Sequence, residues 1–539
     1  MKTLYFNGDF IPMTGEDDGF EALLVAEDGS IAFTGTLEEA RKIAFGAAEV
    51  DLAGKTMMPG FVDAHSHFSG TTQYILTADL SQCTSFADVQ AELRNYVEKR
   101  KVTEDGVVMG TGYDQNNLDE KRHPDKMVLD EVSATIPIFI MHASSHMGVG
   151  NTKMLELANI TEETPDPTGG RFGRVGDTQE PDGYAEEPSA FFSFTAVTQP
   201  RMNMNLPAMV GEMQDYYLEH GITTCQDGAT QPDFADMFCA LAQQGAFKLD
   251  LVGYPMEGTN VEETLAKHAD FESQDYTGRF RLGGVKMFLD GSPQGRTAWM
   301  TEPYEFSGIN EPGYTGYGTM TDEAALAYAK AAVDNNRQLL AHANGDAAGD
   351  QLLRVYEQAV NESDNPNARN LRPVMIHCQT MRRDQYEKMA AINMIPSIFV
   401  DHVWYWGDIH LKNFGSERAN RISAVKDALD LGLHYTFHND TPVLHPNLLE
   451  AVWCAVNRLT KGGLQLGADQ AVGVYDALKA ITIQGAYQYG EEDRKGTLEA
   501  GKLADLVILE KNPLKVSERD IRDIKVLETI KEGDSIWKR

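Results

Sequence analysis

The chain has 539 residues, of which 42% are hydrophobic and 24% are charged, so it can bury a large core in one or more domains. Its formal net charge at pH 7 is −34. This excess of acidic residues argues against nucleic acid and anionic membranes as partners, because phosphate groups are bound by clustered Lys and Arg.

The cysteines and the first residues of the chain indicate the compartment. The five cysteines are scattered and form no CxxC pair, which argues against a disulfide framework or a zinc-thiolate site. The opening MKTLYFNGDFIPM lacks the apolar run of a signal peptide, and no stretch reaches the roughly 20 apolar residues of a membrane span. We therefore expect a soluble, cytoplasmic protein.

Both ends of the chain are rich in short strands and turns. The first segment carries the hairpin turns NGD and EDGS, and the last contains KGTLEAGKLADLVILEKNPL followed by IKVLETIKEGDSIWKR. We predict that residues 1–58 and 491–539 together form a small β-module, into which the rest of the chain is inserted.

The middle of the chain, residues 59–490, has a different pattern. Short apolar runs such as PIFIMHA, RLGGVKMFLD and PVMIHCQ alternate with segments of helical period such as DEAALAYAKAAVDNNR. This alternation predicts an α/β fold with a parallel sheet, and the length suits a (β/α)8 TIM barrel. Residues 70–220 are too long for one loop and its helix, so we predict an inserted subdomain or lid after the first strand.

The strongest local motif is PGFVDAHSHF, residues 59–68. Side chains alternate along a strand, so His65 and His67 point the same way, about 7 Å apart at ~3.3 Å per residue. Both imidazoles can then bind one divalent metal, and the carboxylate of Asp63 can orient them without binding the metal itself. The pair alone is a modest signal, since two unrelated histidines would give the same letters.

Two further histidines follow apolar runs, His342 in QLLAHANGD and His377 in PVMIHCQ. A lone histidine after such a run is more often a core residue than a ligand. Two of them at the ends of separate strands, added to the first pair, favour a four-histidine metal site. Zinc is the metal expected for imidazole ligands.

Asp440 in HYTFHNDTPV ends a late strand and offers a carboxylate that can accept a proton from metal-activated water. The alternative is a helix cap or turn residue, which the following Thr441-Pro442 also favours. Three nearby histidines could be mistaken for ligands, and we favour Asp440 over them: His434, His438 and His445.

Lys286 lies within the apolar run RLGGVKMFLD. A lysine there is costly unless it is neutral, paired or modified. Beside two cations its amine could carry CO₂ as a bridging carbamate. The alternative is an ion pair with Asp290 or Asp227.

Taken together and in this order, six motifs resemble the amidohydrolase superfamily: PGFVDAHSHF, VKMFLDGSPQGRTA, HANGDAA, IHCQ, FHNDTPV and GTLEAGKLADLVIL. More narrowly, the chain is similar over nearly its whole length to the YtcJ-like branch (amidohydrolase family 3), which includes N-substituted formamide deformylases. The resemblance implies a distorted (β/α)8 barrel with a β-sandwich built from both termini.

The resemblance also implies roles for single residues. His65 and His67 would bind the more buried metal, a carboxylated Lys286 would bridge, and His342 and His377 would bind a second ion. Asp440 would be the general acid/base. The residues that match the family's substrate side are His146 and Glu187. Arg296 and Arg418 also fit this side, and a structural ion-pair role is the alternative for either arginine.

The chain departs from the family pattern at three places. It has His438-Asn439-Asp440 where Gly-Ser-Asp is usual, and Ile376 where a Glu commonly precedes the second metal histidine. Pro293-Gln294-Gly295 replaces the common Leu-Gly-Ser. None of these changes removes a ligand, so they bear on substrate identity more than on metal binding.

The sequence therefore predicts a hydrolase that cleaves a non-peptide, amide-like C–N bond, such as that of an N-substituted formamide, with one or two divalent ions. Deamination of a cyclic amidine and ester, lactone or phosphoester hydrolysis remain alternatives, because the same activated water serves them all. A barrel that binds a small molecule without turnover is a third alternative, and histidines without any metal are the weakest. The partner expected is a small-molecule substrate, and homodimer formation is left open.

Overall fold

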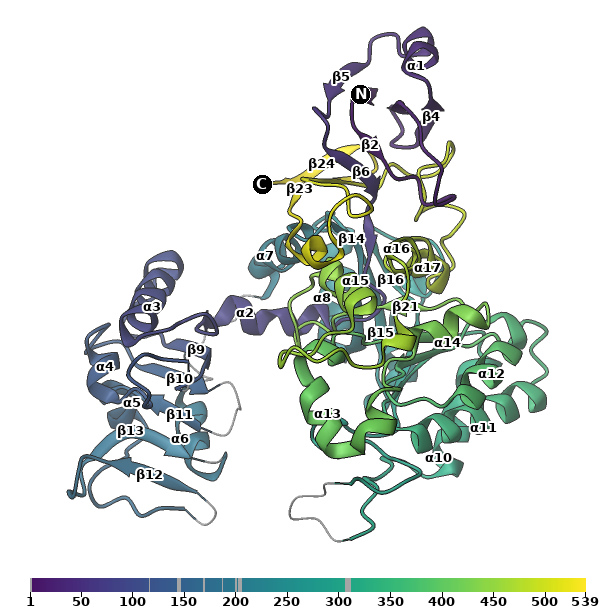
Figure 1. The fold of residues 1–539 in the computed structure, drawn as a ribbon. Helices are drawn as coiled ribbons and strands as arrows, with labels where there is room; N and C mark the ends of the chain where they lie inside the picture. The colour runs from purple at the N-terminus through teal and green to yellow at the C-terminus, as the bar shows by residue number, and fades with distance from the viewer. Residues whose placement is uncertain are drawn as a thin grey trace. The chain divides into compact units, whose positions relative to one another are not determined.

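The computed structural model describes residues 2–539 except 116, 143–146, 168–169, 187, 199–200, 202–205 and 306–311 (Figure 1). The chain divides into two compact units. The first comprises Met1–Gly70 with Val210–Arg539, and the second Thr71–Met209. Along the described residues, no helix is long and apolar enough to cross a membrane.

Two parallel sheets form the centre of the first unit. Their orders are β16-β15-β14-β7 and β17-β18-β19-β20-β21. A parallel bridge between Met256 and Lys286 connects them. The strands are β7 (Phe61–Val62), β14 (Ile222–Thr230), β15 (Asp250–Pro255), β16 (Phe280–Leu282), β17 (Gly284–Phe288), β18 (Gln338–Ala343), β19 (Val374–His377), β20 (Ile395–Ile398) and β21 (Thr436–Phe437).

Helices follow these strands along the chain. They are α7 (Leu206–Leu218), which starts in the second unit, α8 (Pro232–Gln243), α9 (Val261–Lys267), α10 (Asp322–Asp334), α11 (Asp346–Glu362), α12 (Arg383–Ala391), α13 (His402–Ala419), α14 (Val425–Asp430), α15 (Leu448–Asn457), α16 (Val474–Ala480) and α17 (Ile483–Gln488). Strands such as β19 (VMIH) are fully buried, as expected where helices cover both faces of a parallel sheet. The predicted α/β class is confirmed.

One predicted strand is divided. The run RLGGVKMFLD forms two strands, β16 and β17, that meet at Gly283 and Gly284. A Cβ atom on Gly284 would lie 2.1 Å from the carbonyl oxygen of Gln338. The close approach of β18 therefore requires glycine here, and the strand breaks at the glycine pair.

The two ends of the chain meet in one sheet, of order β2-β6-β22-β23-β24. A second sheet, β4-β3-β1-β5, carries α1 (Leu37–Ile43). A buried cluster includes Leu23, Met57, Leu506 and Ile530 and so joins both ends. The strands are β1 (Thr3–Phe6), β2 (Asp9–Phe10), β3 (Ala22–Val25), β4 (Ile31–Gly35), β5 (Ala48–Asp51), β6 (Thr56–Pro59), β22 (Leu506–Leu509), β23 (Val526–Lys531) and β24 (Asp534–Lys538).

The second unit has its own sheet, β12-β13-β11-β10-β9-β8, and its own buried core. It lies inside residues 70–220, the range that the sequence predicts to be inserted. The apolar runs VVMG and PIFIMHA belong to this sheet and not to those of the first unit. Its elements are α2 (Thr72–Leu76), β8 (Ala78–Asp79), α3 (Phe86–Arg100), β9 (Val108–Tyr113), α4 (Lys126–Asp130), β10 (Ile138–His142), β11 (Met147–Gly150), α5 (Thr152–Leu157), β12 (Arg171–Arg174), β13 (Pro181–Glu186) and α6 (Pro188–Thr198).

Candidate metal centre

Six predicted site residues are carried by β7, β17, β18, β19 and β21 or by the turns that follow these strands: His65, His67, Lys286, His342, His377 and Asp440. Parallel strands direct their carboxyl ends toward one side, so residues distant in sequence can meet there. His65 and Lys286 are completely buried, and His377 and Asp440 are nearly so.

The structure brings these six residues together. Nε2 of His65 lies 3.5 Å from Oδ1 of Asp440 and 3.4 Å from Nζ of Lys286. Nε2 of His67 lies 3.3 Å from the same carboxylate oxygen. Potential ligand atoms of His65, His377 and Asp440 all lie within 4.8 Å of one another. This set of nitrogen and oxygen donors suits a divalent transition metal such as zinc.

The orientation of His65 is fixed by Gln226 in β14. The amide nitrogen of Gln226 donates to the carbonyl of Ala64 (3.0 Å) and to the hydroxyl of Tyr489 (3.1 Å). Its amide oxygen therefore faces Nδ1 of His65, at 2.6 Å, and accepts the imidazole proton. Nε2 of His65 keeps its lone pair, directed toward Asp440 and Lys286, as a metal ligand requires.

His342 and His377 form the other half of the cluster. Nδ1 of His342 lies 3.1 Å from Nε2 of His377. This is close to the ~3.4 Å between two ligands of a tetrahedral zinc, given Zn–N bonds of ~2.0–2.1 Å. Burial lowers the pKa of His342 to about 4 and that of His377 well below its ordinary value, so both rings are neutral at pH 7. Gly291 O and Asn344 Nδ2 hold the far side of His342, at 3.2 and 3.0 Å from Nε2.

The Nζ of Lys286 forms no ion pair with any carboxylate of the described residues. Asp290 accepts hydrogen bonds from backbone N–H groups, and Asp227 accepts from Ser69. The alternative of an ion pair with either carboxylate is therefore wrong. Burial lowers the pKa of Lys286 to about 7, against the opposing attraction of Asp440 and Glu257. Its amine is thus partly neutral at neutral pH, the form that can react with CO₂.

Asp440 follows β21 in a left-handed conformation, with φ of 53°, which Asp tolerates better than most residues. Burial alone would raise its pKa, but the contact with His67 and nearby cationic groups hold the pKa below its ordinary value. Its side chain does not cap the next helix, because α15 begins at Leu448. A buried, ionised carboxylate beside the imidazoles can accept a proton.

A fifth histidine, His438, also lies in the cluster. It is fully buried, with Nε2 3.3 Å from Nδ1 of His377. Its Nδ1 lies 3.0 Å from the hydroxyl of Ser397 in β20. The sequence gives no separate signal for His438, Ser397 or Gln226 beyond a polar residue within or next to an apolar run.

The sequence model of the amidohydrolase family matches residues 48–536. The chain belongs to the amidohydrolase family. As a member it is a hydrolase of carbon–nitrogen bonds, so the predicted family and enzyme class are confirmed.

The amidohydrolase is 27% identical over 536 residues to an N-substituted formamide deformylase from Arthrobacter pascens, covering 95% of this chain and 94% of that protein. It is 24% identical to the putative amidohydrolase YtcJ of Bacillus subtilis, with full coverage of both chains. An uncharacterized metal-dependent hydrolase from Pyrococcus furiosus shares its fold with a TM-score of 0.73, at 22% identity over 96% of this chain and all of that one.

The structure describes only two of the four predicted substrate-side residues of this amidohydrolase. His146 and Glu187 lie outside the described residues. Arg296 lies in the loop after β17 with φ of 59°, and its role stays a prediction. The guanidinium of Arg418 donates to carbonyl oxygens of Phe414, Glu302 and Pro303, at 2.7–3.1 Å, so it ties α13 to that same loop.

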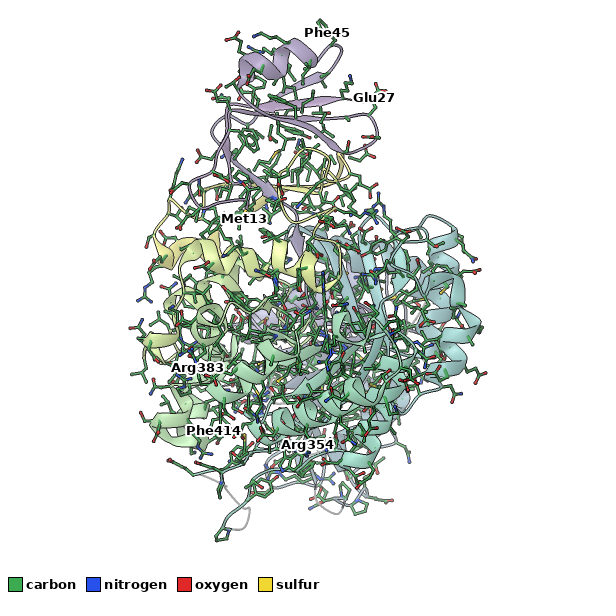
Figure 2. All side chains as sticks on the ribbon, turned by 90° about the vertical axis from the view of Figure 1, so that its right-hand side faces the viewer. Met13, Glu27, Phe45, Arg354, Arg383 and Phe414 are labelled. Carbon is green, nitrogen blue, oxygen red and sulfur yellow. The ribbon has the colours of Figure 1, made fainter. Side chains whose placement is uncertain are left out.

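A cavity of about 960 Å³ opens in the first unit of the amidohydrolase, among loops that follow β17, β18 and β19. Two of its lining residues, Arg383 and Phe414, lie in the lower half of Figure 2, away from Phe45 at the top. Thr380 on its wall donates to the carbonyl of Asn344, the residue that contacts His342. None of the six candidate site residues lines this cavity, so we assign it no part in the candidate centre.

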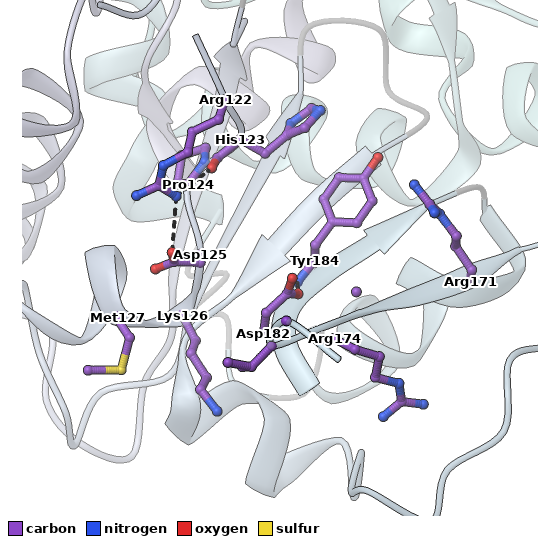
Figure 3. Close-up of a pocket in the computed structure, with 13 residues that line it drawn as sticks. Arg122, His123, Pro124, Asp125, Lys126, Met127, Arg171, Arg174, Asp182 and Tyr184 are labelled. Atoms are coloured by element: carbon purple, nitrogen blue, oxygen red, sulfur yellow. Dashed lines mark hydrogen bonds and ion pairs between the residues drawn. The ribbon is translucent and has the colours of Figure 1, made fainter. Parts of the chain in front are cut away.

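A cavity of about 580 Å³ lies in the second unit (Figure 3). Its cations already have partners. Arg122 pairs with Asp125 at 3.0 Å and Arg171 with Glu186 at 2.6 Å, while Arg174 donates to three backbone carbonyls. Because these three arginines already have partners, we assign this cavity no part in the chemistry.

Proposed function

We propose that this amidohydrolase is a metal-dependent enzyme that cleaves an amide-like, non-peptide C–N bond, with N-substituted formamides as the substrate class to test first. The observation that carries the proposal is the meeting of four histidines, a buried lysine and an ionised aspartate where parallel strands end. The name of the relative from Arthrobacter pascens supports the choice of formamides.

We also propose that the parallel strands close into a distorted (β/α)8 barrel, in the order β7, β14, β15, β17, β18, β19, β20, β21. The Met256–Lys286 bridge supports continuity between the two sheets. The backbone N–H of His67 donates to the carbonyl of Thr441 at 2.6 Å, which supports closure between the first and last strands. In this proposal the terminal sheets are the β-sandwich, and Thr71–Met209 is the inserted subdomain.

His65, His67, His342 and His377 would hold one or two divalent ions, with zinc the expected metal. A cation there supplies Lewis acidity, which lowers the pKa of water toward about 7 and polarises a substrate carbonyl. Lys286 would serve as a bridging ligand after its neutral Nζ bonds to the carbon of CO₂ and releases one proton. His65 and His67 would hold one ion, and His342 and His377 would hold the other.

Asp440 would carry the proton. Its ionised Oδ1, 3.3 Å from Nε2 of His67, takes a proton from the attacking water and then delivers it to the leaving nitrogen. The carbonyl carbon of the substrate gains the water oxygen and loses the amine. For an N-substituted formamide the products are formate and a primary amine.

The proposal is tested by purifying the protein, reconstituting it with zinc and measuring the products released from a substrate panel. The panel holds an N-substituted formamide, a cyclic amidine, an ester and a lactone. We expect the N-substituted formamide to release formate and an amine. A chelator should abolish this release, and added zinc should restore it. Ammonia from the amidine would favour the deaminase instead. Less than one divalent ion per chain after reconstitution would contradict metal dependence.

A further inference from the structure

His438 is a buried histidine whose two ring nitrogens both have partners. Nε2 faces Nδ1 of His377 at 3.3 Å, and Nδ1 faces Oγ of Ser397 at 3.0 Å. The three residues come from neighbouring strands, since β20 lies between β19 and β21 in the sheet. Strand pairing therefore sets a row of three polar groups that ends at a candidate metal ligand.

The direction of hydrogen bonding in this row follows from the proposed function, on which the inference rests. If His377 binds a cation through Nε2, its ring proton must lie on Nδ1. The only acceptor placed for that proton among the described residues is Nε2 of His438. His438 then carries its own proton on Nδ1 and donates it to Ser397.

We infer that His438, supported by Ser397, is a positioning residue that holds His377 in the tautomer and orientation needed to bind the second metal ion. Packing supports the same arrangement, because the ring of Phe399 lies 5.2 Å from that of His438 and 6.0 Å from that of His377. His377 itself has φ of 74°, a conformation that non-glycine residues rarely adopt. Its ring direction therefore depends on what surrounds it.

The rival role for His438 is that of a fifth metal ligand. Its ring centre is only 5.2 Å from that of His65, so proximity alone does not exclude this role. A positioning residue needs only a hydrogen-bond acceptor near Nδ1 of His377. A ligand needs the imidazole itself. Substitutions that keep or remove an acceptor therefore separate the two roles.

The test compares His438→Gln, whose amide oxygen can accept the proton of His377, with His438→Leu, which cannot. Zinc stoichiometry and affinity are measured by titration against a chelating indicator, together with turnover. We expect His438→Leu to weaken one of the two ions by about 10–100-fold, the usual cost of losing a partner of a metal-bound histidine. His438→Gln should stay within about threefold of the parent.

A matched control is His410→Leu in α13. His410 is also fully buried, and its Nε2 lies 3.0 Å from Nδ1 of His402. This variant should lose thermal stability as His438→Leu does, yet bind zinc like the parent. Ser397→Ala and Ser397→Thr form a second pair that does not disturb the histidine: Ala should weaken the same ion, and Thr, which keeps the hydroxyl, should not.

Three results would overturn the inference. Parental affinity for both ions in His438→Leu would show that His377 needs no such support. Equal losses in His438→Gln and His438→Leu would favour direct ligation by His438. A parent protein that binds no zinc would instead refute the proposed function, which the stoichiometry of the parent reports before any variant is compared. If His438→Leu fails to fold, parental zinc affinity in Ser397→Ala would likewise overturn the inference.

Discussion

At the scale of single residues, the chemistry depends on the environment that each side chain is given. Asp440 and Lys286 are both buried in one cluster, yet burial and neighbouring charge move their proton affinities in ways that serve different tasks. Asp440 stays ionised and can accept a proton. Lys286 loses its proton more readily than an exposed lysine and becomes a nucleophile toward CO₂.

Asp440→Asn should separate catalysis from metal binding. The amide keeps the size of the side chain and cannot accept a proton, so turnover should fall by roughly 10²–10⁴-fold, the usual contribution of a general base. Zinc content, measured on the same preparations, should change little because the histidines remain. Unchanged turnover would remove Asp440 from the mechanism. A parent without turnover on any compound that both proteins bind would favour the non-catalytic binding barrel.

Lys286 should make the stability of the metal-free, CO₂-free protein depend on pH. Its pKa is about 7 in the folded state and ordinarily 10.5, so between these values the unfolded chain binds a proton that the folded chain does not. The free energy of unfolding should therefore rise with pH across this window, by up to a few kcal/mol, and the contribution is lost as the pH falls to 7.

Urea unfolding of the parent and of Lys286→Met at pH 7, 8 and 9 measures this difference. The gap between the two proteins should shift in favour of the parent as the pH rises. Curves that stay parallel would show that the lysine titrates normally, and the argument for a carbamate would weaken with it.

At the scale of elements, a buried ion network joins the C-terminal sheet to the parallel sheet β16-β15-β14-β7. Nζ of Lys531 in β23 lies 2.5 Å from Asp250 in β15 and 2.6 Å from Asp505. Lys495 contacts the same oxygen of Asp250 at 2.5 Å. The C-terminal sheet is thereby fastened to the parallel sheet.

Lys531→Met should lower the free energy of unfolding by about 3–5 kcal/mol, because it leaves buried carboxylates without a full partner. The matched control is Lys538→Met in β24. Lys538 is exposed, so its ion pair with Glu528 should be worth at most about 1 kcal/mol. Denaturant unfolding of both variants measures the contrast. A loss below 1 kcal/mol for Lys531→Met would mean that the network stabilises little beyond its own desolvation cost.

At the scale of the whole molecule, the two units differ in whether their described side chains form a possible metal site. The described His, Cys, Asp and Glu groups that could hold an ion are confined to the first unit. The second unit has a separate core and a sheet of its own. Zinc should therefore act on the stability of one unit and not of the other.

Calorimetry with zinc and with a chelator should resolve this difference. Free zinc at 100 times its dissociation constant should stabilise the first unit by about 2.7 kcal/mol and raise its unfolding temperature. A separate transition of Thr71–Met209, where one is seen, should not move. An equal shift in both transitions, or in neither, would contradict a metal centre confined to the first unit.

Much of the fold and site could be predicted from the sequence. The apolar runs that lead to His342 and His377 form buried strands, as predicted, because full burial of a parallel strand is a local pattern in the sequence. The strand alternation predicted through PGFVDAHSHF is wrong, because β7 ends at Val62 and both His65 and His67 lie in the segment that follows it. The family and the enzyme class followed from motifs in order, and the comparison confirmed both. The division of RLGGVKMFLD into two strands was not predicted, because it depends on how closely β18 approaches.

Only the tertiary structure decided which residues support the ligands. Gln226, His438 and Ser397 lie far apart in sequence and meet their partners through the register of β7 with β14 and of β19, β20 and β21. Strand pairing between distant segments produces no periodic pattern in the sequence of either segment. The sequence by itself therefore determined the candidate ligands, while the packing of the strands determined the orientation, the pKa shifts and the hydrogen-bond partners of each candidate.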